Sequence, residues 1–573
     1  MASPWWVTDS LDKVFPDSAR PIDAPAAIEL WAARNETEDA QIAIAVPEGK
    51  RVNKAAFSFS PLKGPKGHSI APDRLKAFWE WYVWVHANPP ANTDPSTYLR
   101  KAPAFFPDAF VESPEPGLRG GVTQPLWVSV QVPADAPAGD YRGTLTITMD
   151  FRYGSTETIK VPVLVHVWPF ALPETPTMHQ TEWFDTGALA DWYHIEPWSE
   201  QHWEWIGKVA KDMAAHKQDM IGTHFTDLVD VTRTRSGSLD FDFRRLDRWV
   251  DIFTRAGLNW IEGMHVAGRT GDWTSQIGFN RWTPKDEAGK PIDTSRKKMS
   301  DRQFAFYAEG LLKAVHGRLK ERGLVKTFVQ HVADEPIPAN EASWKAIASQ
   351  VKRWIPGVRR IDAIESEGLR GYCDIQVPQI QEIHNRSNRR YPEELWCYVC
   401  LFPQTIYPNR FLDYPSTRHR IIWWLSWSLN LKGFLHWAYS AWKLWGGVPM
   451  DVPISPWTDL TGGSLYNVDT QPLPAGDTHI VYPGKHSICS SIRWEVIRKG
   501  YEDHALLTML ESACRRPGRK SASALVPARA LLAQIRGDVA RDPARHTHNP
   551  RVMLNVRRAA GDLLGRLAPT RVG

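Results

Sequence analysis

Apolar and polar residues alternate along much of the first third of the chain. Residues 125–133 (PLWVSVQVP) and 158–167 (TIKVPVLVHV) alternate with period two, which is typical of half-buried strands. A turn bounded by glycines at 138–143 (AGDYRG) leads into a further run of this kind at 144–149. Short strands joined by Pro, Gly and Asp turns predict a β-sandwich domain over residues 1–172.

From residue 178 the pattern changes to apolar, strand-like runs that alternate with amphipathic helices. Apolar residues recur at helical spacing over 199–217, 243–256, 300–322 and 342–355. The strand-like runs are 219–224, 259–266, 326–333, 359–364, 373–377, 395–400 and 433–437. About eight units of a strand followed by a helix favour an α/β fold, a (β/α)8 TIM-like barrel, over residues 178–512.

Composition excludes several classes of protein. Of the 573 residues, 43% are hydrophobic and 23% are charged, which is ordinary for a globular chain and excludes a largely disordered one. We expect no integral membrane segment, because no apolar run approaches the roughly 20 residues that span a bilayer. The chain begins without the basic and apolar stretches of a signal peptide, which leaves its localisation open. The five cysteines are too few and odd in number to form a disulfide framework.

The last stretch, residues 513–573, is strongly basic. It contains 13 Lys and Arg against 3 Asp and Glu from residue 514 onward. A basic tail can bind nucleic acid, but Arg529, Arg536, Arg557 and Arg558 lie among apolar residues at helical spacing. We therefore predict a short helical extension with a solvated arginine face, and no nucleic-acid partner. Nothing in the sequence indicates the oligomeric state.

Tryptophan is unusually frequent, with 28 residues. Its indole ring is a flat surface on which the C–H face of a sugar stacks, and its N–H group needs a partner when buried. We expect more than half of these side chains to lie in the core and some of the others to line a carbohydrate groove.

The strongest candidate for catalysis is the pair Asp334-Glu335. It follows the strand-like run 326–333, and Pro336 cannot continue a strand. The C-terminal ends of barrel strands face the active site, and two neighbouring carboxyl groups can serve as a stable anion and as a general acid. Acidic residues before a proline also begin many helices, so a purely structural role is the alternative.

Other catalytic signatures are absent from the sequence. There is no GxGxxG motif after a strand, no phosphate-binding P-loop, no HExxH and no GxSxG. No cluster of His, Cys and Asp has the spacing of metal ligands, so we expect neither a metal nor an organic cofactor.

The segment around the acidic pair resembles the catalytic segment of glycoside hydrolase family 123, the β-N-acetylgalactosaminidases. Further segments resemble the same family in the same order. The resembling segments are 138–143, 329–336 (VQHVADEP), 395–400 (LWCYVC), 408–409 (PN), 433–437 (GFLHW), 476–484 (GDTHIVYPG) and 491–503 (SIRWEVIRKGYED). The likeness covers most of residues 30–510.

The resemblance implies a retaining mechanism in which the 2-acetamido oxygen of the substrate, instead of an enzyme group, attacks the anomeric carbon. By motif position, Asp334 would orient the acetamido N–H, and Glu335 would protonate the leaving oxygen and then activate water. The expected partner is a glycan or glycolipid with β-linked N-acetylgalactosamine (GalNAc). Family relatives include exo- and endo-acting enzymes, and the aromatic stretch 78–107 inclines us slightly to endo action.

The same resemblance directs the choice of substrate-binding residues. Aromatic side chains near strand ends are candidates for a pocket around the acetamido methyl group, and Tyr398 is also a candidate donor to the acetamido oxygen. Two histidines and an asparagine are candidates for binding sugar hydroxyls. The candidates are Trp396, Tyr398, Trp437, Trp442, His265, His331 and Asn409.

Two rival interpretations remain open. A retaining β-glycosidase could use Glu335 as acid/base with a distant carboxylate as nucleophile, for which Glu182, Glu365 and Glu382 are the candidates. Alternatively, the chain is a non-catalytic carbohydrate-binding protein built on a degenerate barrel.

Overall fold

The structure is a computed structural model that describes residues 4–294, 299–364, 366–383, 394–442, 473–515 and 522–567. The chain divides into two compact units. Unit 1 contains Met1–Thr177, Pro403–Asn430 and Ser440–Gly573, and unit 2 contains Met178–Phe402 and Leu431–Tyr439. The domain boundaries at 172 and 512 that the sequence suggests stay a prediction, because each compact unit contains segments from separate parts of the chain.

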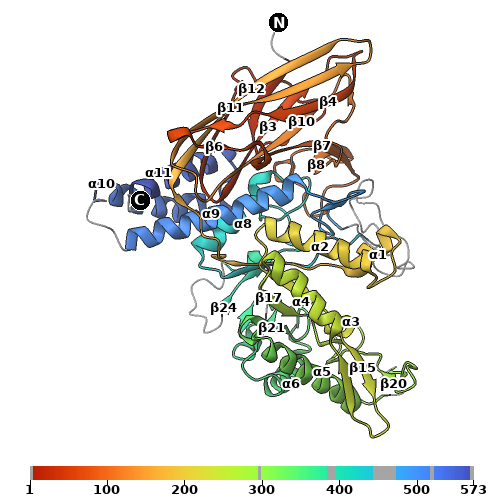
Figure 1. The fold of residues 1–573 in the computed structure, drawn as a ribbon. Helices are drawn as coiled ribbons and strands as arrows, with labels where there is room; N and C mark the ends of the chain where they lie inside the picture. The colour runs from red at the N-terminus through yellow and green to blue at the C-terminus, as the bar shows by residue number, and fades with distance from the viewer. Residues whose placement is uncertain are drawn as a thin grey trace. The chain divides into compact units, whose positions relative to one another are not determined.

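Unit 1 contains two β-sheets, drawn in red to orange in Figure 1. The first has the order β1-β3-β10-β7-β8, and the second has the order β2-β12-β11-β4-β9. Neighbouring strands in these two orders are antiparallel, except that β12 and β2 run parallel. The strands are β1 Trp5–Asp9, β2 Ile28–Arg34, β3 Glu36–Ala45, β4 Arg51–Phe59, β5 Leu62–Lys63, β6 Ser69–Ile70, β7 Leu75–Val85, β8 Ala104–Phe110, β9 Leu118–Arg119, β10 Thr123–Val132, β11 Gly139–Phe151 and β12 Thr156–Ala171.

One hydrophobic core joins these two sheets. Ile42 and Val128 from the first sheet and Ile147 and Val163 from the second belong to the same buried cluster. The period-two runs predicted from sequence lie within β10, β11 and β12, because every second side chain of each strand enters this core. The expected N-terminal β-rich domain is confirmed.

Unit 1 also contains helices from later in the chain, drawn in cyan to blue in Figure 1. They are α8 Ser416–Ser428, α9 Ile492–Arg515, α10 Ala522–Gln534 and α11 Pro550–Leu567, with the short hairpins β27 Tyr482–Pro483 with β28 Ile488–Cys489 and β29 Ala540–Asp542 with β30 Arg545–His546. Helix α11 packs on α9 and on β12, where Gly561 leaves room for the Trp168 ring.

The expectation of a solvated arginine face on the basic tail is wrong for Arg557. Its side chain is only 5% exposed and forms ion pairs with Glu36, Glu38 and Asp503. The next residue, Arg558, is exposed as expected. The C-terminal extension is therefore helical, but a buried ion-pair network ties it to the β-sandwich.

Unit 2 is built on parallel strands. A six-stranded sheet has the order β14-β17-β21-β22-β23-β24, and a three-stranded sheet has the order β13-β26-β25. Their bounds are β13 His179–Glu182, β14 Met220–Thr223, β17 Trp260–Gly263, β21 Phe328–His331, β22 Arg359–Asp362, β23 Ile375–Gln376, β24 Glu394–Leu395, β25 Cys397–Tyr398 and β26 Gly433–His436. β24 and β25 flank Trp396 in one continuous run, so the two sheets share this segment.

Side chains connect the two outermost strands, β13 and β14. Asp219 accepts a hydrogen bond from the Gln180 N–H at 2.9 Å, and the Gln218 amide donates to the Glu182 carbonyl at 3.3 Å. No backbone ladder joins these two strands within the described part of the chain. The expected α/β class is confirmed, while closure into a (β/α)8 barrel stays a prediction.

The helices of unit 2 are drawn in yellow to green in Figure 1. They are α1 Thr186–Tyr193, α2 Glu200–Ala215, α3 Phe225–Leu228, α4 Arg244–Ala256, α5 Asp301–Glu321 and α6 Glu341–Trp354. Four of them (α2, α4, α5 and α6) lie where the sequence periodicity predicts helices. Short strands occur in the intervening loops, namely β15 Asp230–Arg233, β16 Leu239–Asp242, β18 Ala267–Arg269, β19 Ile277–Phe279 and β20 Lys285–Asp286. None of the helices that the structure describes is long and apolar enough to cross a bilayer.

Candidate active site

The acidic pair lies just beyond the C-terminal end of β21, as the sequence predicts. β21 ends at His331, and Asp334 and Glu335 follow in the loop that leads to α6. Glu335 has a φ angle of 43°, in the left-handed region that side chains other than Gly rarely adopt. Such strain persists only where surrounding contacts impose it, and it is frequent at active sites.

Arg269 supplies contacts that hold this loop. Its guanidinium donates to the Asp334 carbonyl at 3.1 Å and to the Glu335 carbonyl at 2.6 Å. The same guanidinium lies 3.6 Å from the centre of the Trp273 ring. Arg269 thus fixes the backbone of both acidic residues and leaves their carboxyl groups for other partners.

The two carboxyl groups have different surroundings. The Tyr398 hydroxyl donates to Oε1 of Glu335 at 2.5 Å, whereas no hydrogen bond reaches the Asp334 carboxyl group from any described residue. Burial and the Asp334 charge raise the pKa of Glu335, and the Tyr398 hydrogen bond partly opposes this. Desolvation by the surrounding protein also raises the pKa of Asp334, although 51% of its side chain is exposed. The positive charges of His331 and Arg269 oppose that rise.

Three residues before Asp334 along the chain, His331 is fully buried between two carboxylates. Its Nδ1 lies 2.9 Å from Asp362 and its Nε2 lies 2.7 Å from Glu262. Only the doubly protonated ring can donate to both. Burial alone would lower the pKa of His331, but the hydrogen bonds and charges of the two carboxylates outweigh burial and raise it to about 9. His331 is therefore an imidazolium at neutral pH.

Asp362 does more than pair with His331. It accepts from the backbone N–H groups of Val332 and Ala333 and from the Trp344 indole at 3.1 Å. These bonds fix the backbone immediately before Asp334. We call Glu262, His331 and Asp362 the buried triad; they come from the adjacent strands β17, β21 and β22.

Glu262 is also fully satisfied. It accepts from the Thr181 hydroxyl at 2.5 Å and from the Trp183 indole at 3.1 Å. Burial favours its neutral form, but His331 and these donors lower the pKa of Glu262 below its usual value. In the triad, the His331 imidazolium therefore lies between two carboxyl groups that both accept its protons.

His265 lies between the buried triad and the acidic pair. Its Nε2 is 3.6 Å from Asp362 Oδ1 and 3.9 Å from Asp334 Oδ1. Burial and the neighbouring His331 charge lower the pKa of His265 to about 3, so its ring is neutral. The rings of His265 and His331 have centres 4.7 Å apart, yet His331 is positively charged and His265 is neutral.

His265, His331 and Asp362 have the proximity expected of metal ligands, with ligand atoms within 4.8 Å of one another. Their hydrogen bonds do not fit such a role. Both nitrogens of His331 carry protons that its carboxylate partners accept, so neither has a lone pair for a metal ion. We assign these residues to a hydrogen-bonded network.

The structure revises several predicted substrate-binding residues. His331 cannot reach a sugar hydroxyl, since it is fully buried and both nitrogens are occupied. Trp396 is also fully buried: its indole donates to Glu394, and its ring covers Gly433. It is a core residue and cannot stack on a sugar.

Trp442 and Asn409 belong to unit 1, and their side chains are buried there. The Trp442 indole donates to the Val481 carbonyl at 3.1 Å, and the Asn409 amide donates to the Pro403 carbonyl at 2.9 Å. Both have structural partners, which contradicts a role in sugar binding. Trp437 in unit 2 is half-buried, and its role stays a prediction.

The rival nucleophiles can be placed in part. Glu182 is fully buried at the end of β13, with an oxygen 3.8 Å from His436, and so it is not open to a substrate. Glu382 is half-buried in a short turn after β23. Glu365 lies outside the described residues.

Sequence reasoning missed Arg269, Glu262 and Asp362. Glu262 and Asp362 occupy strand-like runs, and an acidic residue in an apolar strand is itself a signal of a buried partner. Arg269 lies in a loop without any distinguishing pattern, so only the folded structure relates it to the pair.

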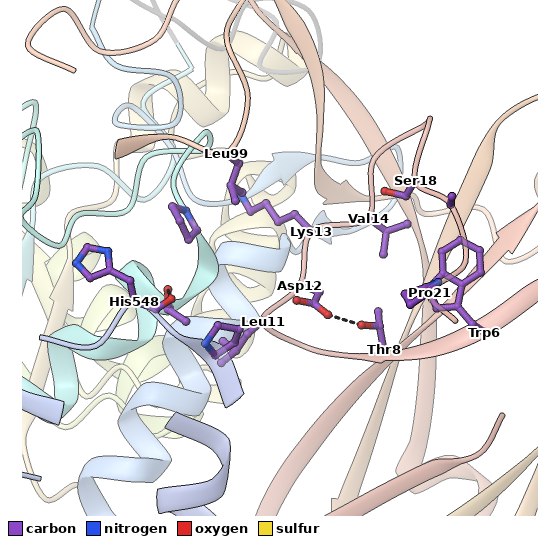
Figure 2. Close-up of a pocket in the computed structure, with 14 residues that line it drawn as sticks. Trp6, Thr8, Leu11, Asp12, Lys13, Val14, Ser18, Pro21, Leu99 and His548 are labelled. Carbon is purple, nitrogen blue, oxygen red and sulfur yellow. Dashed lines mark hydrogen bonds between the residues drawn. The ribbon is translucent and has the colours of Figure 1, made fainter. Parts of the chain in front are cut away.

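A separate cavity of about 370 Å³ lies in unit 1 (Figure 2). Trp6, Lys13 and His548 are among the residues that line it, and on its wall the Thr8 hydroxyl donates to Asp12 at 2.5 Å. It contains none of the predicted catalytic or substrate-binding residues.

Two family profiles match the sequence. The profile described as glycoside hydrolase 123, catalytic domain, matches residues 183–510, and the glycoside hydrolase 123 N-terminal domain matches residues 13–149. No curated protein matches the chain.

One solved structure is similar to this chain over nearly its full length. A family 123 glycoside hydrolase from Clostridium perfringens, analysed for glycolipid glycan hydrolysis, aligns with 98% of this chain and 97% of its own at 15% identity and a TM-score of 0.69. A family 5 mannosidase from Rhizomucor miehei aligns with 58% of this chain and 94% of its own, at 12% identity and a TM-score of only 0.32. The profile matches cover both the β-sandwich and the acidic pair, and the chain therefore belongs to glycoside hydrolase family 123.

Proposed function

We propose that this glycoside hydrolase cleaves β-linked N-acetylgalactosamine with retention of configuration, using the 2-acetamido group of the substrate as nucleophile. The observation that carries the proposal is the different environment of two adjacent carboxyl groups at one strand end. Glu335 is held by the Tyr398 hydroxyl, and Asp334 has an open carboxyl group beside the neutral His265. This difference suits one general acid and one acceptor for an N–H group.

In the first step, Asp334 as an anion accepts a hydrogen bond from the acetamido N–H, which increases the electron density on the acetamido oxygen. That oxygen forms a bond to the anomeric carbon while the glycosidic bond breaks. Glu335 gives its proton to the departing oxygen, so its raised pKa favours the form that this step requires. The product of this step is a cyclic oxazolinium-type intermediate.

In the second step, Glu335 is a carboxylate and removes a proton from water. The water oxygen bonds to the anomeric carbon, and the bond from the acetamido oxygen breaks. Glu335 is then protonated again, and the β-configured sugar leaves. Tyr398 serves as the positioning residue for Glu335, because its hydroxyl binds the carboxyl oxygen in both steps.

The proposed substrates are glycolipid glycans, as for the Clostridium perfringens relative. We also propose that the parallel strands of unit 2 form the expected (β/α)8 barrel, with β24 and β25 counted as one continuous strand, and that the C-terminal strand ends of this barrel carry the pair. We prefer endo action, as the sequence suggested; the aromatic stretch 78–107 of unit 1 has exposed rings such as Trp81 and Phe105.

The test is incubation with glycans and glycolipids that carry terminal or internal β-linked GalNAc, with products identified by mass. We expect free GalNAc, or an oligosaccharide with GalNAc at its new reducing end, and proton NMR of the first product should show the β-anomer. The same glycosides without the 2-acetamido group should not be cleaved. Cleavage of those glycosides would favour an enzyme nucleophile, and the absence of any cleavage would favour a carbohydrate-binding protein.

The matched control is Glu335→Gln, which keeps the shape of the side chain and its contact with Tyr398. General acid catalysis contributes about 10²- to 10⁴-fold, so turnover should fall by a factor in that range. Glycan affinity measured by calorimetry should remain, because the variant removes the proton donor and leaves the pocket. An active Glu335→Gln variant would contradict the assigned acid.

A further inference from the structure

We infer that His265 is the positioning residue for Asp334, and that the buried triad holds His265 in the form that can donate from Nε2. This inference rests on the proposed function, because it assigns Asp334 an anionic role. It replaces the prediction that His265 binds a sugar hydroxyl.

The protonation of His331 decides what the buried triad can offer to His265. His331 donates from both nitrogens, so it has no acceptor to offer to His265. Asp362 Oδ1, which already binds His331, also lies 3.6 Å from His265 Nε2. The nitrogen of His265 that faces Asp362 and Asp334 must carry the proton, because a bare nitrogen lone pair facing two carboxylates would be repelled by both.

Two carboxylates lie near enough to receive that proton, those of Asp362 and Asp334. Both distances from His265 Nε2 exceed a hydrogen bond, and Nε2 has no partner among the described residues. Asp362 already accepts from two backbone N–H groups, the Trp344 indole and His331. Asp334 accepts from none of the described residues, and so a movement of less than about 1 Å makes it the acceptor of His265. Catalytic hydrogen bonds often tighten in this way when substrate binds.

The charged surroundings favour a neutral donor at this position. The groups around His265 are His331, Asp362, Glu262 and Asp334, with His224 also close enough to act on it. The His331 imidazolium prevents a second positive charge on His265. A permanently neutral donor can stabilise the Asp334 anion without taking part in proton transfer.

The test compares His265→Gln with His265→Met. Glutamine keeps an N–H donor near the position of Nε2, and methionine has a similar length but no donor. Loss of one hydrogen bond to a charged group should lower kcat/KM of the methionine variant by about 10- to 100-fold, chiefly through kcat. The acid limb of its pH profile should move to higher pH, because Asp334 becomes easier to protonate. The glutamine variant should keep the wild-type acid limb.

Equal pH profiles for the two variants would overturn the inference, since a role in packing alone would affect them alike. Circular dichroism and the thermal unfolding midpoint of each variant establish that it is folded. If methionine proves unfolded, His265→Asn replaces it, because its shorter amide cannot reach Asp334 from the same backbone and so predicts the same shift of the acid limb.

A measurement without substrate separates this inference from the proposed function. Ring nitrogen NMR of histidine-labelled wild-type protein at pH 7 should show His265 neutral with its proton on Nε2 and His331 doubly protonated. The His265 signals are assigned by their loss in His265→Gln. A proton on Nδ1 alone, or a charged His265, would overturn the inference even if the enzyme is active. If the enzyme cleaves no acetamido sugar, the proposed function fails while these spectra still decide the state of His265.

Discussion

Truncation of Arg557 to alanine should destabilise the packing of the C-terminal helix on the β-sandwich. The Arg557 guanidinium on α11 donates to Asp503 and to the Trp31 carbonyl, both at 2.9 Å, and it pairs with Glu38 at 2.7 Å and with Glu36. All three carboxylates are buried. In the alanine variant, the buried carboxylates of Glu36, Glu38 and Asp503 therefore each lose one of their positively charged partners.

The magnitude follows from what remains around these anions. Removal of one partner from a buried ion pair costs about 3–5 kcal/mol. Here Lys499 stays 2.8 Å from Glu36 and from Glu38, and Arg420 stays 2.7 Å from Asp503. Because each carboxylate keeps one cation, we expect the low end of that range, about 3 kcal/mol.

Hydrogen exchange of peptides from 550–567 measures this quantity locally. A loss of about 3 kcal/mol corresponds to exchange about 100-fold faster, if α11 opens from the rest of unit 1. The matched control is Arg558→Ala, one residue further along the same helix. The Arg558 side chain is exposed, and its guanidinium carbon lies 3.6 Å from the centre of the Trp31 ring. An exposed cation–π contact contributes only about 0.5–1 kcal/mol.

The effect should also depend on pH. Burial raises the pKa of Glu36, but the charges of Arg557 and Lys499 outweigh burial and lower it from 4.5 to about 2. A depressed folded-state pKa contributes stability above pH 4.5 that is lost as the pH falls towards 2. The variant has less of this contribution, so its difference from wild type should shrink below pH 4.5. Equal exchange in the two alanine variants, or a difference that does not change with pH, would refute the reasoning.

Three further predictions concern unit 2. Tyr398→Phe removes the hydrogen bond that lowers the pKa of Glu335, so the alkaline limb of kcat/KM should move to higher pH; an unchanged limb would contradict the contact. The pKa of His331 is raised from 6.5 to about 9, so its contribution of about 3 kcal/mol is complete below pH 6.5 and is lost as the pH rises to 9. Urea unfolding across this range should show that decline in wild type and not in His331→Gln. Gly433→Ala places a methyl group 2.1 Å from the Trp396 ring, so it should cost about 1–3 kcal/mol, measured by urea unfolding, and a neutral effect would mean that the ring can move.

Local patterns were sufficient for the main strands and helices and for the position of the acidic pair. The alternation that defines β10, β11 and β12 is a property of each strand alone, because one face of each strand is buried. The helical periods of α2, α4, α5 and α6 are local for the same reason. Asp334 and Glu335 could be placed at a strand end because Pro336 follows them directly in the chain.

Tryptophan burial was harder to predict, because the same ring suits a core and a sugar platform. Trp396 lies two residues before Tyr398 in the same strand-like run, 395–400. The structure makes Trp396 the cover of Gly433, whereas Tyr398 reaches Glu335. Which neighbour each ring meets depends on strand order, and no local pattern contains that information.

The sequence by itself therefore determined the α/β class, the β-rich N-terminal domain, the family and the acidic pair, because these depend on short-range periodicity and on motifs in a fixed order. Only the tertiary structure decided the charge states around that pair. Glu262, His331 and Asp362 are separated by up to 100 positions, and adjacent strands bring them into contact. The same holds for Arg557, whose burial among carboxylates depends on α11 packing against a sheet built more than 500 residues earlier. Electrostatic energy depends on distance in space and on exclusion of water, which the order of residues alone does not specify.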